Sequence, residues 1–165
     1  MRRAGSGNQS GMSPIRGHAG GWPERAASPG PPDAAPADAA VYPVDRDALA
    51  VLRHAVTRCA LDSGLDEDSR DDLVLIANEL ATNVVRHGGG TGRMALWCEE
   101  HWMMCQISDH GPGIADPERA GAASSPPEAI TGRGLWLVRQ LGHRVDVTSG
   151  PWGTKVTVGM TLLSG

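Results

Sequence analysis

Two segments in the first half of the chain carry apolar residues at the three- and four-residue spacing of an amphipathic helix. The first covers residues 46–61 and follows Asp45, a residue type that caps helix N-termini. The second follows a polar break at residues 62–68, begins with acidic residues in its first turn, and should end where three glycines follow His87. The stripe that this second helix should bury consists of Leu73, Ile76, Leu80 and Val84.

The rest of the chain is dominated by short apolar runs between polar or turn-forming residues, which predicts β-strands. Pro43 lies in the first expected strand, so that strand should form an edge of the sheet. A third helix is expected over residues 134–141, after a long Gly-, Pro- and Ala-rich connection at residues 111–131. This order predicts an α/β two-layer sandwich, with helices packed on one face of a mixed, mostly antiparallel sheet. The expected strands cover residues 39–44, 93–99, 102–108, 143–149 and 155–162.

The first 40 residues differ in composition from the rest of the chain. Ala, Gly, Pro and Ser make up 26 of them. Such a segment has too little apolar area to offset the entropy lost on ordering it. We therefore expect a disordered low-complexity tail over residues 1–40 and one folded domain over residues 41–165.

Charge and hydropathy argue against several functional classes. The 165 residues carry a formal net charge of -4, which offers no broad basic surface for nucleic-acid phosphates. No apolar run reaches the roughly 18 residues of a membrane helix, and no apolar leader follows Arg2 and Arg3. The three cysteines form no CxxC pair, which argues against a disulfide framework or a zinc site. A cytoplasmic protein without a membrane or direct nucleic-acid partner is expected.

Glu79 and Asn83 are one turn apart on the second expected helix, so both side chains should lie on one face. They flank the apolar stripe, where partly desolvated polar groups need partners. The Asn83 amide oxygen suits Mg²⁺, an ion that takes few protein ligands when phosphates complete its shell. Glu79 could polarise an attacking hydroxyl or water. The alternative is a helix that places Glu and Asn at this spacing by chance.

A second group of residues, Asp109-His110-Gly111-Pro112-Gly113, directly follows an expected strand. Its two glycines, Gly111 and Gly113, allow a tight turn and the close approach of a flat ligand. The Asp109 carboxylate can accept a hydrogen bond from an exocyclic amine. Adenine has such an amine where guanine has a carbonyl. An ordinary turn after an edge strand is the alternative.

Two further segments could contact phosphates and a base. Gly132, Arg133, Gly134 and Leu135 stand where the third helix is expected to open, and free amides at a helix N-terminus make an anion site. Arg133 either adds charge to that site or points into water, and the glycines could simply end a loop. Thr154, at the start of the last strand, carries a hydroxyl that could support a base pocket through water, or it is merely a hairpin residue.

Other nucleotide-binding folds require residues that this chain lacks. A P-loop needs GxxxxGK[ST], and the eukaryotic-type kinase fold needs a strand lysine and an HRD loop. The only lysine, Lys155, stands close to the end of the sequence in neither context. A GxGxxG dinucleotide fingerprint is absent as well.

In this order, the motifs resemble those of the GHKL superfamily of ATPases, and most closely the small anti-sigma-factor serine/threonine kinases of actinobacteria. The resemblance spans about residues 41–163 and implies the Bergerat fold, that of the histidine kinase-like ATPase domain. The N box is similar to the stretch from Glu79 through Asn83 to His87, the G1 box to residues 109–113, and the G2 box to the segment from Gly132. Thr154 matches the late threonine of the family.

The resemblance also implies a role for each of these residues. Glu79 would be the general base, Asn83 the Mg²⁺ ligand and Asp109 the acceptor for the adenine amine. Gly113 would line the base pocket, and Gly111 would be a further ATP-binding residue. Gly132, Arg133, Gly134 and Leu135 would form the phosphate-binding end of a lid over ATP.

The function that this resemblance implies is an ATP-dependent serine/threonine protein kinase. It would phosphorylate a STAS-type anti-anti-sigma factor and sequester a sigma factor; the oligomeric state is left open, a homodimer included. The alternative is an ATP-gated partner-binding module with little or no kinase activity. A third interpretation is a structural domain whose glycines only form turns, which would not bind Mg-ATP.

Overall fold

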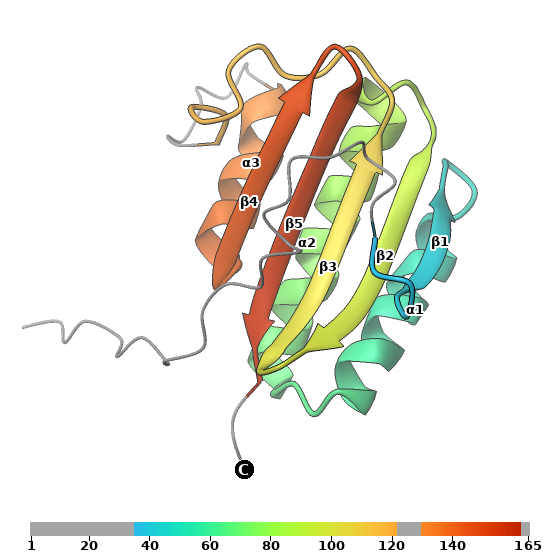
Figure 1. Cartoon of the computed structure of the whole chain (residues 1–165), viewed down its shortest axis with the longest axis vertical. Coiled ribbons are helices and arrows are strands. Elements are labelled where there is room, and N and C mark those ends of the chain that lie inside the picture. The colour runs from blue at the N-terminus through green and yellow to red at the C-terminus, as the bar shows by residue number, and fades with distance from the viewer. Residues whose placement is uncertain (1–34, 122–129, 163–165) are drawn as a thin grey trace, which may run out of the picture.

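Five strands form one sheet and three helices lie on one of its faces in the computed structural model, which describes residues 35–121 and 130–162 (Figure 1). The elements are β1 (Ala40–Val44), α1 (Leu49–Asp62), α2 (Glu67–His87), β2 (Gly92–Glu99), β3 (Trp102–Asp109), α3 (Ile130–Leu141), β4 (Arg144–Gly150) and β5 (Gly153–Thr161). The strand order is β1-β2-β3-β5-β4, and every neighbouring pair is antiparallel. The predicted α/β two-layer sandwich is confirmed.

Helix α1 begins at Leu49, three residues later than the sequence predicts. Its N-cap position is Ala48, which makes no side-chain cap. Asp45 instead accepts hydrogen bonds from the backbone N–H groups of Asp47, at 2.9 Å, and Ala48, at 2.8 Å. The expectation that Asp45 caps this helix is therefore wrong, because its carboxylate closes the turn that precedes the helix.

Helix α2 is the element that anchors the sheet layer to the helix layer. Its N-cap is Asp66, whose carboxylate accepts the Ser69 N–H at 2.9 Å, so the helix begins inside the expected polar break. The helix ends at His87, as predicted, and the Gly88 N–H caps its last carbonyls. Each fully buried side chain of this size contributes roughly 1.5–3 kcal/mol. The predicted stripe is buried throughout: Leu73, Ile76, Leu80 and Val84.

The strands confirm the two predicted hairpins, with boundaries that differ from the expected ones by one or two residues. Strand β5 starts at Gly153, two residues earlier than expected, so that Thr154 pairs with Asp109 in the ladder with β3. β1 is an edge strand, as Pro43 predicts. The sheet face that points away from the helices holds a second apolar cluster, against which Ala35 and Ala39 pack. That cluster consists of Ala95, Trp97, Trp102 and Met104.

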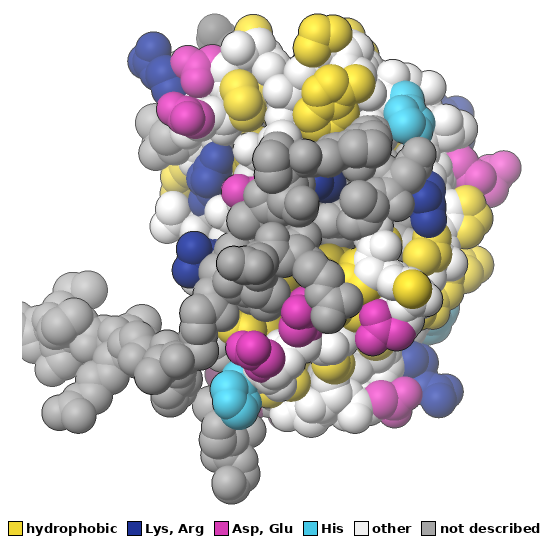
Figure 2. Space-filling model, viewed as in Figure 1, with side chains coloured by type: hydrophobic (Ala, Val, Ile, Leu, Met, Phe, Trp, Pro, Cys, Tyr) yellow, Lys and Arg dark blue, Asp and Glu magenta, His cyan; other side chains and the backbone are white. Residues whose placement is uncertain are grey.

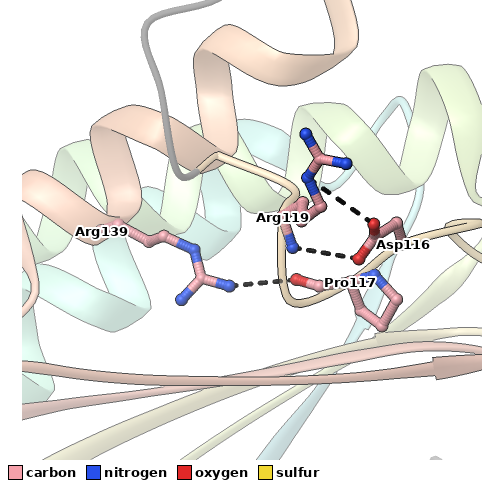
Figure 3. Close-up of polar contacts among 4 residues, drawn as sticks. All are labelled: Asp116, Pro117, Arg119 and Arg139. Atoms are coloured by element: carbon pink, nitrogen blue, oxygen red, sulfur yellow. Dashed lines mark hydrogen bonds and ion pairs between the residues drawn. The ribbon is translucent and has the colours of Figure 1, made fainter.

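Helix α3 begins at Ile130, four residues before the expected start. The described part of the expected long connection is attached to this helix by Arg139 (Figure 3). Its Nε donates to the Ala120 carbonyl at 2.9 Å, and its guanidinium donates to the Pro117 carbonyl at 3.1 Å. Asp116 accepts the Arg119 N–H at 3.2 Å in the same turn. Residues 122–129, and residues 1–34 of the expected tail, lie outside the described residues.

The surface of the protein carries charged side chains of both signs. Figure 2 shows basic and acidic side chains interspersed around the rim of the visible face, in keeping with the small net charge of -4. Over residues 35–121 and 130–162, none of the helices is both long and apolar enough to cross a bilayer.

Candidate nucleotide-binding site

A cavity of about 350 Å³ lies between the helices and the end of the sheet where β3 stops and β5 starts. This volume is within the usual range for small-molecule sites. Four polar residues line it from three elements: Asn83 and His87 from α2, Asp109 from β3 and Thr154 from β5. Gly113 of the glycine turn also lines it. The apolar part of its wall consists of Leu80, Val84, Ile107, Ile114, Ala120, Leu135 and Val156.

Asp109 is held in one orientation by two backbone amides. Its Oδ1 accepts the Gly111 N–H at 2.9 Å and the Thr154 N–H at 3.2 Å. The side chain is only 8% exposed. Burial raises the pKa of this carboxyl above its ordinary value, against the opposite effect of the two amides and of His110. The carboxylate is thus a buried, oriented acceptor in the cavity wall.

Gly88 lies directly against the other side of this carboxylate. A Cβ added to Gly88 would lie 2.6 Å from Asp109 Oδ2 and 2.7 Å from its Cγ, and the Gly111 backbone packs against Gly88 in turn. The sequence pattern identified Gly88 only as the residue that ends a helix. The missing side chain at Gly88 leaves room for the Asp109 carboxylate. Local sequence patterns could not predict this contact, because it joins residues that lie far apart in the sequence.

Replacing Gly88 with Ala should therefore damage the cavity as well as the fold. The new methyl group forces Asp109 to shift against the two amides that hold its Oδ1, which should cost about 1–3 kcal/mol of unfolding free energy. If Asp109 accepts the amine of a bound adenine, as its motif predicts, then nucleotide affinity should fall by roughly tenfold or more, since the shift weakens that hydrogen bond. Thermal unfolding and calorimetry measure the two effects.

The matched control for this substitution is Gly64→Ala. An added Cβ at Gly64 meets no atom within 4 Å, but its φ of +79° makes any side chain strained. This variant should lose stability without losing nucleotide affinity. If both variants lose affinity in proportion to stability, Gly88 has no specific role in the cavity.

The glycine turn is closed against the β4–β5 hairpin. Gly113 has a φ of +81°, and an added Cβ there would collide with the Gly150 carbonyl oxygen. The next residue, Ile114, donates its N–H to the Ser149 hydroxyl at 2.7 Å. Ser149 also lies 2.9 Å from the Thr154 hydroxyl. Sequence reasoning missed Ser149, and the signal that could have found it is its position opposite Thr154 in the hairpin.

Glu79 and Asn83 converge on one point of α3, as their spacing on α2 predicts. A Cβ added to Gly134 would lie 3.1 Å from Glu79 Oε2 and 3.3 Å from Asn83 Nδ2. Both side chains are partly buried, and Asn83 also lines the cavity. The acid and the amide therefore lie together at the edge of the cavity.

The start of α3 differs from the arrangement that the sequence suggests. Because the helix begins at Ile130, Gly132 lies in its first turn, and Gly134 and Leu135 lie inside it, where each N–H bonds to the carbonyl four residues earlier. Leu135 instead contributes its side chain to the cavity wall, and Arg133 is exposed.

Comparisons with known proteins bear on the family and on the fold. A family model described as a histidine kinase-like ATPase domain matches residues 42–160. The structure of the RsbU and RsbW domains of Rv1364c from Mycobacterium tuberculosis is similar, with 19% identity and a TM-score of 0.57. The match covers 78% of this chain but 33% of that chain, so this chain spans about a third of it.

A second similar structure is the histidine kinase domain of a blue-light activated histidine kinase from Erythrobacter litoralis EL346. It has 19% identity and a TM-score of 0.49, and the match covers 69% of this chain and 60% of that chain. No curated protein matches the chain in sequence.

Proposed function

Because the chain belongs to the family of histidine kinase-like ATPase domains, we propose that it is an ATP-dependent protein kinase that phosphorylates a serine or threonine of a partner protein. ATP binding follows from membership of the family. One observation carries the assignment of the site: Asn83, Asp109 and Thr154 line a single cavity, and Glu79 lies beside Asn83 at its edge.

Recognition of the base depends on Asp109. Its Oδ1 is occupied by two amides, so Oδ2 is the oxygen suited to accept the 6-amino group of adenine. Guanine presents a carbonyl at that position, and two acceptors without a proton between them repel each other. The site should therefore bind ATP in preference to GTP, with Thr154 supporting the base from the neighbouring strand.

The residues present also fit a magnesium ion that is bound together with ATP. Among the described residues, no group of three or more His, Cys, Asp or Glu side chains could hold a metal without the nucleotide. A single amide oxygen, that of Asn83, suits Mg²⁺ when phosphate oxygens and water supply the other ligands. Such an ion, when bound, neutralises charge on the phosphates.

The role that we propose for Glu79 is that of the general base, which its position beside Asn83 supports. In the transfer step, the acceptor hydroxyl oxygen forms a bond to the γ-phosphorus, the bond from that phosphorus to the ADP oxygen breaks, and the hydroxyl proton passes to the Glu79 carboxylate. The role that we propose for Gly132, Arg133, Gly134 and Leu135 is to bind the phosphates. For the Gly134 and Leu135 amides, this requires the first turns of α3 to unwind from the conformation described.

The partners that we propose are a STAS-type anti-anti-sigma factor, as the phosphate acceptor, and a sigma factor that the protein sequesters. The support is the resemblance of the motifs together with the similarity to a structure that contains an RsbW domain. Regulation of transcription, a cytoplasmic location and a homodimer are parts of the same proposal.

The test is to incubate the purified full chain with γ-labelled ATP, Mg²⁺ and candidate STAS proteins from the same genome. We expect label on one STAS protein, stable in acid as a serine or threonine phosphoester. The variant in which the acceptor hydroxyl of the STAS protein is replaced by Ala should remain unlabelled. Tight ATP binding without transfer to any candidate would contradict the kinase proposal.

A second candidate function is an ATP-gated partner-binding module with little or no transfer activity. One observation favours it: the Gly134 backbone lies against Glu79 and Asn83, where the phosphates and the acceptor would have to meet. In that case, Mg-ATP should change the affinity for a partner, while Glu79→Ala leaves partner capture unchanged. Absence of any Mg-ATP binding at millimolar nucleotide would contradict both functions.

A further inference from the structure

Ser149 belongs to a row of three residues that crosses the sheet at the cavity end. Thr154 on β5 pairs with Asp109 on β3 on one side and with Ser149 on β4 on the other. Asp109 and Thr154 line the cavity, whereas Ser149 lies behind them. Ser149 therefore has no direct contact with the cavity, and any role in nucleotide binding must act through its neighbours.

The Ser149 hydroxyl joins three parts of the cavity wall. It accepts the Ile114 N–H at 2.7 Å, lies 2.9 Å from the Thr154 hydroxyl and donates to the Gly153 carbonyl at 3.2 Å. A hydroxyl offers one proton and two lone pairs, so these three contacts use its hydrogen-bonding capacity almost completely. The shortest of them fixes a backbone amide of the glycine turn.

The same hydroxyl determines how the glycine turn is closed. The turn leaves β3 at Asp109, whose carboxylate is bonded to the Thr154 N–H, and it returns to the sheet at Ile114. Its first end is held by the strand ladder. Its second end is held by the bond to Ser149 and by the close packing of Gly113 against Gly150.

We infer that Ser149 is a positioning residue for the nucleotide base: it latches the turn at Ile114 onto β4 and holds the Thr154 hydroxyl in the cavity wall. The part of this inference that concerns nucleotide rests on the proposed function. The catalytic pair lies on α2, which Ser149 does not contact through any of these bonds. Loss of the latch therefore weakens binding of the base and leaves the transfer step intact.

The experiment compares Ser149→Ala with Ser149→Thr, which keeps the hydroxyl, and with Thr148→Ala. Thr148 is the adjacent β4 residue, its side chain points to the other sheet face, and its hydroxyl donates within the strand to Asp146 at 3.3 Å. S149A should raise the KM for ATP by about tenfold, change kcat by less than about twofold and reduce the preference for ATP over GTP. S149T should restore all three values, and T148A should match the unsubstituted protein.

A second measurement needs no nucleotide. Hydrogen exchange of the Ile114 amide should be about tenfold faster in S149A than in T148A, because its acceptor is gone. If S149A does not fold, Ser149→Cys keeps the volume with a weak hydrogen-bonding group and takes its place.

The ATP kinetics and the Ile114 exchange together distinguish failure of the Ser149 latch from failure of the proposed function. Unchanged KM, unchanged ATP preference and unchanged Ile114 exchange in S149A would overturn the latch. Equal losses in S149A and T148A would overturn it as well, because they would indicate general destabilisation. If the unsubstituted protein binds no ATP, the proposed function fails, while faster Ile114 exchange in S149A still supports the latch.

Discussion

Glu79→Gln lowers the rate of phosphoryl transfer by about 10²- to 10⁴-fold, the range expected for loss of a general base. The neutral amide keeps the size of the side chain, so its packing beside Asn83 and Gly134 should persist. It cannot take up the proton of the acceptor hydroxyl at neutral pH. The affinity for ATP should change by less than about twofold, since Glu79 does not line the base cavity. Single-turnover transfer and equilibrium binding of ATP measure the two quantities.

Glu67→Gln is the control for this experiment, because it makes the same chemical change on the same helix. Glu67 lies at the exposed start of α2, where its carboxylate is 3.9 Å from Arg70. Its replacement should leave the transfer rate unchanged. If E79Q transfers phosphate at the rate of E67Q, then Glu79 does not act as a base and the catalytic assignment is wrong.

Asp109→Asn should reduce ATP affinity by roughly 10- to 100-fold, the effect of losing a hydrogen bond to a charged group. The Asn carbonyl can still accept the Gly111 and Thr154 amides in place of Oδ1. Its amide nitrogen then stands where Oδ2 was, and it faces the adenine amine as a second donor. The preference for ATP over GTP should disappear, which competition binding with the two nucleotides measures.

The same substitution should not destabilise the fold. Burial raises the pKa of the Asp109 carboxyl, so its ionised form costs more free energy in the folded protein than in the unfolded chain. A neutral amide does not carry that cost. The melting temperature of D109N at pH 7 should equal or exceed that of the unsubstituted protein. A clear loss of stability would mean that the two amide bonds depend on the charge of the carboxylate.

The sign of the pH dependence follows from the raised pKa of Asp109. A folded-state pKa above 3.8 means that the folded protein holds this proton more tightly than the unfolded chain. The contribution to stability is therefore present at low pH and is lost as the pH rises through the folded-state pKa. ATP affinity has the opposite trend, because protonation removes the acceptor, and D109N should show neither dependence.

The sequence alone predicted the elements and the clustering of motifs well, because both depend on local patterns. The apolar stripe of α2 is periodic, so it identifies the buried face and places Glu79 and Asn83 together. The turn after β3 carries its own glycine signal. These local patterns suffice to predict which segments surround the cavity.

The sequence could not predict how particular side chains are used. Asp45 and Asp66 both precede helices, but only Asp66 caps one, because Asp45 bonds to the turn before α1. Gly88 was assigned to helix termination, although it also lies against Asp109. Ser149 acts through its register against Thr154 and through Ile114, which is 35 residues away. Such contacts depend on tertiary packing, which no local pattern encodes.

The strand order has a consequence for how the protein becomes competent to bind nucleotide during synthesis. β3 pairs with β5 rather than with the strand that follows it in sequence, and the bond between Asp109 and Thr154 joins positions 45 residues apart. A nascent chain that has not yet released β5 from the ribosome has neither the far wall of the cavity nor the partner of Asp109. Nucleotide therefore binds only after β5 has joined the sheet. By mass action, bound nucleotide then stabilises the complete domain relative to folding intermediates that lack β5.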